Sequence, residues 1–348
     1  AISSSDSLYF KNDSIGLNFL DNANLYLLPC IAGHVGADAA AVILSEAPNE
    51  SEETVLIIDV GTNAELILGN KSELYACSSP TGPAFEGAQI SSGQRAAPGA
   101  IEKIKIDPIS KDPIFKVIGC DYWSNEEQFQ NFLSNQKITG ICGSGIIEAI
   151  AEMRMTGILD ASGLIGTSSE TGSERCISEG RTNSYIIYKN MVNDETAIKI
   201  TNSDVRAIQL AKAALFAGSR LLMDEMKIDK IDKIILAGAF GAHISTKHAM
   251  VLGMIPDCNL KKVTSAGNAA GAGAMIALLN RKSRLEISKT VKKISKIETA
   301  MAPKFQEYFV SASAIPNSMF SFPELEKVMK LPDVSFNQKK RSKRANYN

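Results

Sequence analysis

The stretch LIIDVGTNAELILG at residues 56–69 decides the fold class, because an apolar run stops at a carboxylate and then resumes. Residues 55–58 are apolar and mostly β-branched, which predicts a strand covered on both faces. Asp59 closes that strand, and the polar turn at 61–63 precedes a second strand at 66–68. A carboxylate, small polar side chains and consecutive backbone N–H groups at a strand end suit a metal-bound phosphate chain.

The composition is that of a folded protein. Its 348 residues, 45% of them hydrophobic, suffice for one large or two ordinary domains. The net charge of −1 gives no basic field of the kind that nucleic-acid binders carry. No apolar run is long enough to span a bilayer, and the opening AISSSDSLYFKND lacks the features of a signal peptide. We therefore expect a cytoplasmic protein with small-molecule or protein partners, no nucleic acid and no membrane contact.

Six cysteines are spread along the chain without a C-x-x-C pair or a cluster of four. Zinc ribbons and iron–sulfur clusters need closer ligand groups, so neither is encoded in this sequence. We expect reduced, mostly buried thiols and a colourless chain that carries no redox centre of its own. The cysteines are Cys30, Cys77, Cys120, Cys142, Cys176 and Cys258.

The predicted elements alternate between strands and helices, as in an α/β protein. An acidic loop at 45–54 and a polar, loop-rich region at 162–184 interrupt them, and the Gly/Pro-rich loop at 80–87 is expected to run into a helix. Strands are expected near 26–28, 55–58, 66–68, 74–77, 101–106, 115–118, 138–142, 185–188, 196–200 and 231–237. Helices are expected near 33–44, 146–154, 201–226 and 268–279, and the basic tail at 338–348 is expected to be disordered.

Three loops, each directly after a predicted strand, share one pattern. They are DVGTN at 59–63, PTGPAFEG at 80–87 and AGAFG at 237–241. Glycines at such positions let a backbone approach a ligand closely. The sequence contains no GxxxxGK[ST] phosphate loop, so a nucleotide site here is of a different kind.

These loops resemble the nucleotide pocket of the actin, hexokinase and heat-shock ATPase superfamily. There, a DxG-type phosphate turn, a Gly-rich loop, an amphipathic helix and a strand ending in glycines surround the nucleotide. Over residues 25–315 the chain is similar, more specifically, to the C-terminal domain of the reductive activators of corrinoid-dependent methyltransferases. The segments that occur in the same order are LLPCIAGHVGADAAAV, DVGTNAELILGN, CSSPTGPAFEGAQISSGQRAAPGAIE, GICGSGIIEAIAEM, IQLAKAAL, LAGAFG, GNAAGAGA and FQEYFV.

The resemblance implies an actin-like ATPase (ribonuclease H-like) α/β fold with mixed sheets flanked by helices. One lobe is expected to be largely complete and the other partial. The implied divisions are the remainder of a first lobe with a connecting helix at 1–54 and a second lobe with the nucleotide loops at 55–267. The last two divisions are a returning helix and cap at 268–315 and an extension with the basic tail at 316–348.

Proteins that the chain resembles use ATP to help reduce an inactive Co(II) corrinoid protein to Co(I). The resemblance thus implies an ATP-dependent reductive activase in the intact protein, with ATP and Mg²⁺ as ligands, a corrinoid protein as partner, and a homodimer. The family's plant-type cysteines are missing here, so a [2Fe–2S] cluster is expected only in a missing N-terminal domain. The family's upstream DxGTT hairpin is also missing, so we expect a fragment that binds ATP weakly.

The resemblance also implies roles for individual residues. Asp59 would hold Mg²⁺ through water and act in catalysis, and Glu86 would orient water unless it is only a helix-start carboxylate. Gln209 and Lys212 lie three apart, on one helix face that is either nucleoside-binding or solvated. The expected nucleotide contacts are Gly61, Thr62, Asn63, Gly82, Gly87, Gln209, Lys212, Gly238, Ala239 and Gly241.

Other interpretations stay open. A small-molecule kinase of the same superfamily would need an acceptor pocket and a general base, for which Glu86 is the one candidate. A docking module would bind the corrinoid protein without nucleotide. GICGSG at 140–145 has the spacing GxxGxG instead of the dinucleotide-binding GxGxxG, and Cys142 in it is expected to be a buried thiol rather than a nucleophile. The scattered histidines, for which we expect capping or surface roles, are His34, His243 and His248.

Overall fold

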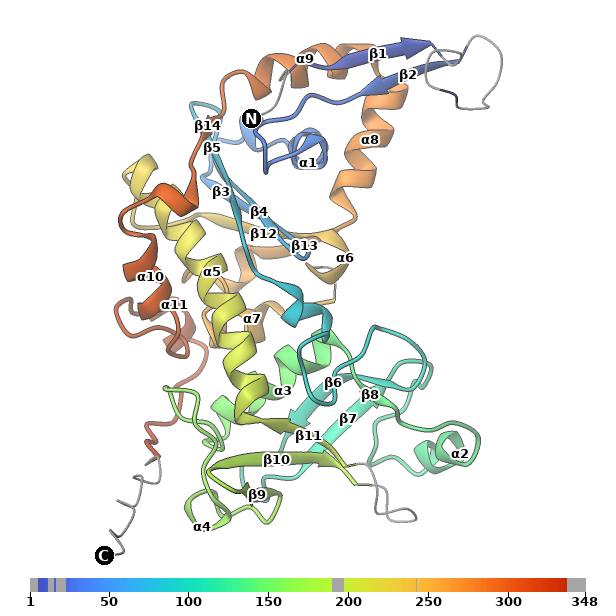
Figure 1. Cartoon of the computed structure of the whole chain (residues 1–348), viewed down its shortest axis with the longest axis vertical. Helices are drawn as coiled ribbons and strands as arrows, with labels where there is room; N and C mark the ends of the chain where they lie inside the picture. The colour runs from blue at the N-terminus through green and yellow to red at the C-terminus, as the bar shows by residue number, and fades with distance from the viewer. Residues whose placement is uncertain (1–5, 12–15, 17–22, 190–196, 242, 337–348) are drawn as a thin grey trace, which may run out of the picture.

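The computed structural model describes residues 6–11, 16, 23–189, 197–241 and 243–336 of the chain (Figure 1). The basic tail predicted at 338–348 and the first residue of the strand predicted at 196–200 lie outside these ranges. Among the described residues, no helix combines the length and the apolarity that a bilayer crossing needs.

A six-stranded mixed sheet forms the upper part of the molecule in Figure 1. In sheet order its strands are β13 (Val263–Gly267), β12 (Lys233–Ala237), β3 (Val55–Val60), β4 (Ala64–Gly69), β5 (Leu74–Ser79) and β14 (Ser295–Lys296). β3, β4 and β5 form an antiparallel meander, and β12 joins β3 in parallel. The predicted α/β class is confirmed, and the strand predicted at 55–58 is buried on both faces.

Helices cover both faces of this sheet, because its side chains alternate between two apolar clusters. One face carries α1 (Ala37–Glu46), α8 (Ala269–Leu279) and α9 (Arg281–Val291), and the other carries α5 (Asn202–Met226). Ile57 and Ile67 pack in the cluster that includes residues of α1, α8 and α9. Leu56 and Leu66 pack in the cluster that includes the buried side of α5.

The two helices α1 and α8 cross at backbone contact. A Cβ on Gly273 of α8 would lie 1.8 Å from the carbonyl oxygen of Ala41 on α1, so only glycine fits there. This contact explains why the helix at 268–279 is so rich in small residues, and it fixes α1 beside the sheet.

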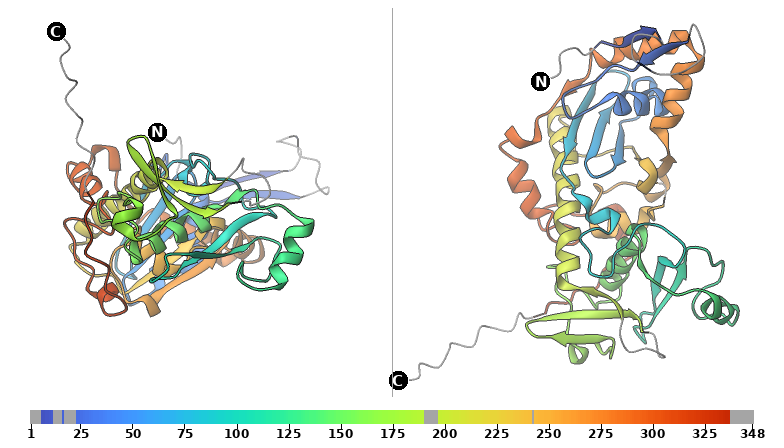
Figure 2. Two further views of the ribbon diagram at one scale, coloured as in Figure 1. Left: turned by 90° about the horizontal axis from the view of Figure 1, so that it is seen from below. Right: turned by 45° about the vertical axis from the view of Figure 1, so that its right-hand side comes forward.

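Helix α5 connects the two parts of the molecule, running from the six-stranded sheet to the lower strands (Figures 1 and 2). Its start is a capping box, in which the Thr201 hydroxyl accepts from the Asp204 backbone N–H and Asp204 accepts from the Thr201 N–H. Its end at Met226 is followed by Lys227 in the left-handed conformation. The helix predicted at 201–226 is therefore confirmed to within one residue.

Two three-stranded sheets form the lower part of the molecule (Figure 1). The first contains β7 (Pro113–Val117), β6 (Ala100–Ile106) and β8 (Gly140–Ile141), and the second contains β11 (Ile198–Thr201), β10 (Thr182–Tyr188) and β9 (Cys176–Glu179). The helices here are α2 (Gln128–Asn135), α3 (Gly143–Met155) and α4 (Ser168–Thr171). Helix α3 packs on β6 so closely that a Cβ on Gly145 would lie 2.4 Å from the Ile101 carbonyl oxygen.

Smaller elements complete the chain. Residues of α10 and α5 share a small apolar cluster that joins Tyr308 to Leu221 and Ala217. The remaining strands are β1 (Leu8–Lys11) and β2 (Asn24–Leu27), which form a separate hairpin. The remaining helices are α6 (Gly238–Gly241), α7 (Thr246–Leu252), α10 (Phe305–Ser311) and α11 (Pro323–Glu326).

The structure differs from the elements predicted from the sequence at several places. The loop at 80–87 does not run into a helix, because its single 3-10 turn at Pro83–Glu86 ends at Gly87, whose φ is 82°. The region at 162–184 contains α4 and β9, where a loop was expected; β9 is held by its pairing with β10. Helix α1 begins at Ala37 instead of residue 33, and α3 begins at Gly143 instead of residue 146.

Candidate functional site

The turn between β3 and β4 holds the first predicted site residues. Asp59 pairs with Glu65 and Val60 with Ala64, which leaves Gly61, Thr62 and Asn63 as a tight turn. The Gly61 N–H donates to the Asn63 carbonyl oxygen at 2.9 Å, and all three turn residues are exposed. The turn therefore presents two small polar side chains to solvent at the end of the sheet.

The Gly-rich loop after β5 is bound to this turn by hydroxyl groups. Thr81 Oγ1 donates to the carbonyl oxygens of Gly61 at 3.2 Å and Thr62 at 3.0 Å. Thr62 Oγ1 in turn donates to Glu86 Oε1 at 2.7 Å. Gly82 has a φ of 70°, and a Cβ there would meet nothing within 4 Å, so open space lies in front of this backbone. Two of the three predicted loops thus meet at the end of β3.

The third loop, which forms α6, also reaches this point. Ala237 at the end of β12 pairs with Asp59, so the next residue passes directly over the carboxylate. Gly238 has a φ of 84°, and a Cβ there would lie 2.6 Å from Asp59 Oδ1. Gly241 is anchored at the other end of α6, where its carbonyl oxygen accepts from Ser265 Oγ at 3.1 Å. The side chain of Ala239 lies outside the described residues.

Carboxylates gather beside the turn. Burial raises the pKa of Asp59, and the charge of Asp38 on α1 raises it further. Burial also raises the pKa of Glu65 to about 7, with Asp38 and then Asp59 adding to the effect. A bound cation would relieve this repulsion. The described residues contain no group of three or more His, Cys, Asp or Glu side chains with a metal-binding arrangement, so Mg²⁺ here would take ligands from phosphate and water.

The structure does not bring Gln209 and Lys212 to this group of loops. They share one face of α5, as their spacing predicts, but that face is buried, so the solvated alternative is wrong. Gln209 Nε2 donates to the carbonyl oxygens of Ser162 at 2.9 Å and Ser313 at 2.7 Å. Lys212 Nζ donates to the carbonyl oxygens of Ala314 and, at 2.7 Å, Pro316. Contact of these two side chains with a nucleoside stays a prediction.

His248 is neither a surface residue nor a cap, which corrects the sequence-based expectation. It is buried between α7 and α3, with Nε2 2.9 Å from Glu152 Oε1 and Nδ1 3.9 Å from Glu148 Oε1. The other oxygens of the two carboxylates accept from the backbone N–H groups of Ile104 and Ile106 on β6. The four-residue spacing of the glutamates on one helix face was the available signal. His34 and His243 are exposed, as expected.

The thiols follow the sequence-based prediction. All six cysteines are free, and Cys77, Cys142, Cys176 and Cys258 are buried. Cys142 lies at the start of α3 with its Sγ 3.3 Å from Ser144 Oγ, which is the environment of a structural thiol. Burial raises the pKa of Cys258 to about 11, so this thiol stays protonated near neutral pH.

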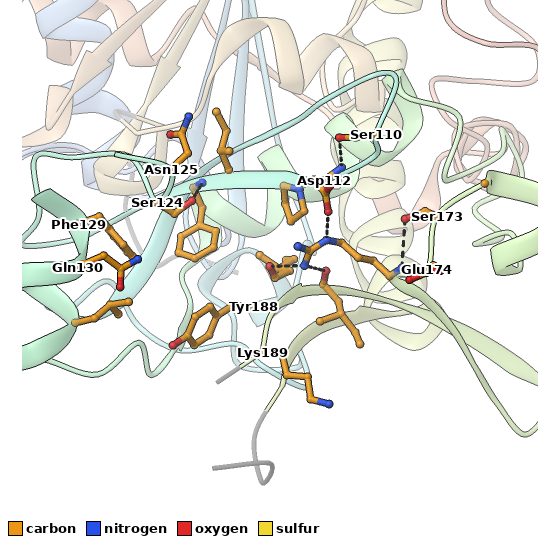
Figure 3. Close-up of a pocket in the computed structure, with 18 residues that line it drawn as sticks. Ser110, Asp112, Ser124, Asn125, Phe129, Gln130, Ser173, Glu174, Tyr188 and Lys189 are labelled. Atoms are coloured by element: carbon orange, nitrogen blue, oxygen red, sulfur yellow. Dashed lines mark hydrogen bonds and ion pairs between the residues drawn. The ribbon is translucent and has the colours of Figure 1, made fainter. Parts of the chain in front are cut away.

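A cavity of about 870 Å³ is lined by residues of β7, α2 and β10 and their neighbours, and by none of the three loops (Figure 3). Its lining includes Phe115, Phe129 and Tyr188. At its edge, Arg175 Nε donates to Asp112 Oδ1 at 2.5 Å, and Nη1 donates to the Ile186 carbonyl oxygen at 3.4 Å. The guanidinium of Arg175 is thus already bound to other groups of the protein. The cavity is therefore not the site of the phosphate binding that we predict for the strand-end loops.

Comparison with known proteins identifies the fold. Residues 53–326 match the family described as the C-terminal domain of RACo, the ASKHA domain. A solved structure named reductive activator for corrinoid, iron-sulfur protein superposes with a TM-score of 0.76 and 31% identity, covering 91% of this chain and 48% of that one. The actin-like ATPase fold inferred from the motif order is therefore confirmed.

Two curated relatives agree with the family match and with the solved structure. The corrinoid activation enzyme RamQ of Eubacterium limosum is 33% identical in an alignment of 329 residues, which covers 90% of this chain and 51% of the relative. The [Co(II) methylated amine-specific corrinoid protein] reductase of Methanosarcina barkeri is 28% identical in an alignment of 303 residues, which covers 84% of this chain and 51% of the relative. The chain thus spans about half the length of these relatives. It belongs to the family of corrinoid reductive activators, and within them to their C-terminal ASKHA domain.

Proposed function

We propose that this chain is the ATP-binding domain of an ATP-dependent reductive activator, which returns an inactive Co(II) corrinoid protein of a methyltransferase system to Co(I). The observation that carries the proposal is the meeting of three strand-end loops at Asp59, with Thr62, Glu86 and Gly238 in contact across them. The relatives' names suggest the redox partner, since one is a corrinoid activation enzyme and the other a reductase of a Co(II) corrinoid protein.

The residues fit a bound Mg²⁺–ATP. Gly238 approaches Asp59 too closely for any side chain, and Gly82 faces open space, so backbone N–H groups can reach phosphate oxygens from two sides. Asp59 would hold the metal through water, and Thr62 and Asn63 would contact the terminal phosphates. Mg²⁺, when bound, neutralises phosphate charge. Glu86 accepts a hydrogen bond from Thr62 and would orient a water molecule beside the phosphates.

The proposal extends to the whole protein. A [2Fe–2S] cluster belongs to a region outside this chain, the assembly is a cytoplasmic homodimer, and the chain divides near residues 54, 267 and 315. In that assembly nucleotide binding would shift the balance between two arrangements of the lobes, and the corrinoid protein would bias the same balance.

A chimera tests the proposal. Residues 53–326 of this chain would replace the matched region of the Eubacterium limosum relative, and Co(I) formation would be followed by absorbance with and without Mg²⁺–ATP. We expect ATP to accelerate Co(I) formation and Asp59→Ala to abolish ATP hydrolysis while circular dichroism stays unchanged, because Asp59 faces the loops at a strand end. Co(I) formation that does not depend on ATP would favour a docking module, and a phosphorylated small molecule would favour a kinase.

A further inference from the structure

A cationic face covers the outer side of the β6–β7 hairpin. Lys103 and Lys105 point out of β6, because their neighbours Ile104 and Ile106 are buried. Lys116 stands on β7 directly opposite Lys103 in the strand register. Like charges on directly opposed strand positions destabilise a hairpin. The face therefore gathers positive charge at a cost to the protein's own stability.

The protein does not neutralise this charge internally. Among the described residues, no carboxylate forms an ion pair with Lys103, Lys105 or Lys116. Lys116 Nζ donates to a backbone oxygen, that of Asp121, at 2.6 Å. The charge of Lys103 acts on Glu148, which is buried behind β6 and accepts from the Ile104 N–H. Glu126 accepts from the Trp123 N–H beside the lysines, but it forms no ion pair with them. The ammonium groups of Lys103 and Lys105 can therefore pair with an outside anion.

An aromatic ring holds two of these lysines in place. Lys105 Nζ lies 4.6 Å and Lys116 Nζ 5.6 Å from the ring centroid of Trp123, which is the only tryptophan of the chain. Such contacts offset part of the repulsion and fix the direction of the charges. The neighbouring Tyr122 is 43% exposed. Tryptophan and tyrosine are enriched at protein–protein binding surfaces, and exposed charges there steer the partner's approach.

We propose that the face formed by Lys103, Lys105, Lys116 and Trp123 docks an acidic surface of the corrinoid protein. This rests on the proposed function, which makes the corrinoid protein the partner. A nucleic acid or an anionic membrane is negatively charged over a large area and would also meet the rest of this molecule, whose net charge is −1, whereas an acidic patch on a protein needs to match only this face. β6 and β7 lie at the opposite end of the molecule from α8 and α9 (Figure 1), so docking leaves the upper sheet uncovered.

Charge reversal tests the proposal on the full chain. Lys103→Glu with Lys105→Glu is compared with a matched control, Lys230→Glu with Lys330→Glu, which changes the net charge equally at exposed positions away from the β6–β7 hairpin. The association rate with a purified Co(II) corrinoid protein is measured at several salt concentrations. We expect the first pair to slow association about tenfold at low salt and to flatten the salt dependence, and the control to change it less than about twofold. Lys103→Gln with Lys105→Gln, a milder change, should give an intermediate rate.

Each outcome of these measurements decides whether the docking face, its occupant or the proposed function stands. Equal slowing by both pairs of substitutions, or no slowing by the Lys103 and Lys105 pair, overturns the docking face. If the wild-type chain binds the corrinoid protein in that experiment, the proposed function still stands. A wild-type chain that does not bind the corrinoid protein overturns both. Parallel titrations with single-stranded DNA and with phosphatidylserine vesicles complete the test. Binding of either that is stronger than that of the corrinoid protein, and is lost in the first pair, overturns the assignment of the occupant.

Discussion

Gly238 is the residue where the backbone of α6 meets the Asp59 carboxylate. Gly238→Ala should cost roughly 1–2 kcal/mol for its left-handed backbone and more for the contact of its Cβ with Asp59 Oδ1. Gly172→Ala is the matched control, because Gly172 has a φ of 72° and open space around it. Thermal unfolding and Mg²⁺–ATP titration of both variants check this. We expect both to lose stability, and Gly238→Ala alone to lose ATP affinity; equal affinities would remove Gly238 from the site.

Glu65 should make the stability of the chain depend on pH. Its folded pKa of about 7 lies above the ordinary glutamate value of 4.5, so the folded state binds more protons than the unfolded state between these values. The free energy of unfolding should therefore fall as pH rises from about 4.5 to about 7, by on the order of 1–2 kcal/mol after allowance for partial exposure. Glu65→Gln should remove this slope in urea melts without Mg²⁺. The same slope in the wild type and in Glu65→Gln would contradict the assignment of this pH dependence to Glu65.

Individual residues were predictable where a motif fixed them. Asp59, Gly82 and Gly238 followed from loops at strand ends, and the structure brings them to one place. The influence of Asp38 on Asp59, and of Asp59 on Glu65, was not predictable, because it depends on the placement of α1 and on the hairpin register.

On α5, the buried Lys212 shows how one helix holds a distant loop. Burial holds the pKa of Lys212 well below its usual range, and the amine donates to carbonyl oxygens of residues 314 and 316. Lys212→Met fills the space but leaves those oxygens without a donor, so the segment should open more often. Hydrogen exchange of the Ile315 amide, which donates to the Ala161 carbonyl oxygen, should accelerate roughly tenfold. Arg206→Met, on the exposed side of α5, should leave it unchanged; equal rates in wild type and Lys212→Met would contradict the role.

Elements were predictable where they are long or buried. Helix α5 carries a capping box and helical apolar spacing, and β3 and β4 are continuous apolar runs. β13 escaped prediction because it is an edge strand with exposed Thr264 and Ser265, and its pairing with β12 supplies what its sequence lacks. β9 escaped for the same reason, since two of its four residues are exposed. Strands that owe their place to a pairing partner rather than to apolar residues of their own leave little local signal.

At the scale of the whole molecule, α8 is unusual because it contains no polar residue and yet the rest of the protein covers only part of it. One side packs on α1 through Gly273, while Met275, Leu278 and Leu279 are 55%, 67% and 77% exposed. Leu285 on α9 is 63% exposed. A helix that is apolar on all sides is normally buried, so this surface favours contact with another protein body.

We expect the isolated chain to self-associate through this surface. Leu278→Glu with Leu285→Glu should shift sedimentation profiles toward the monomer at concentrations where wild type forms larger species, because charged side chains there would have to be desolvated on association. Thermal stability should change by less than about 0.5 kcal/mol, since both side chains are mainly exposed. Ile109→Glu is the control for added charge at an apolar site, because Ile109 is 89% exposed in the turn between β6 and β7, at the other end of the molecule (Figure 1). A wild-type chain that stays monomeric at every concentration, or equal dissociation by the control, would show that α8 and α9 do not form the contact.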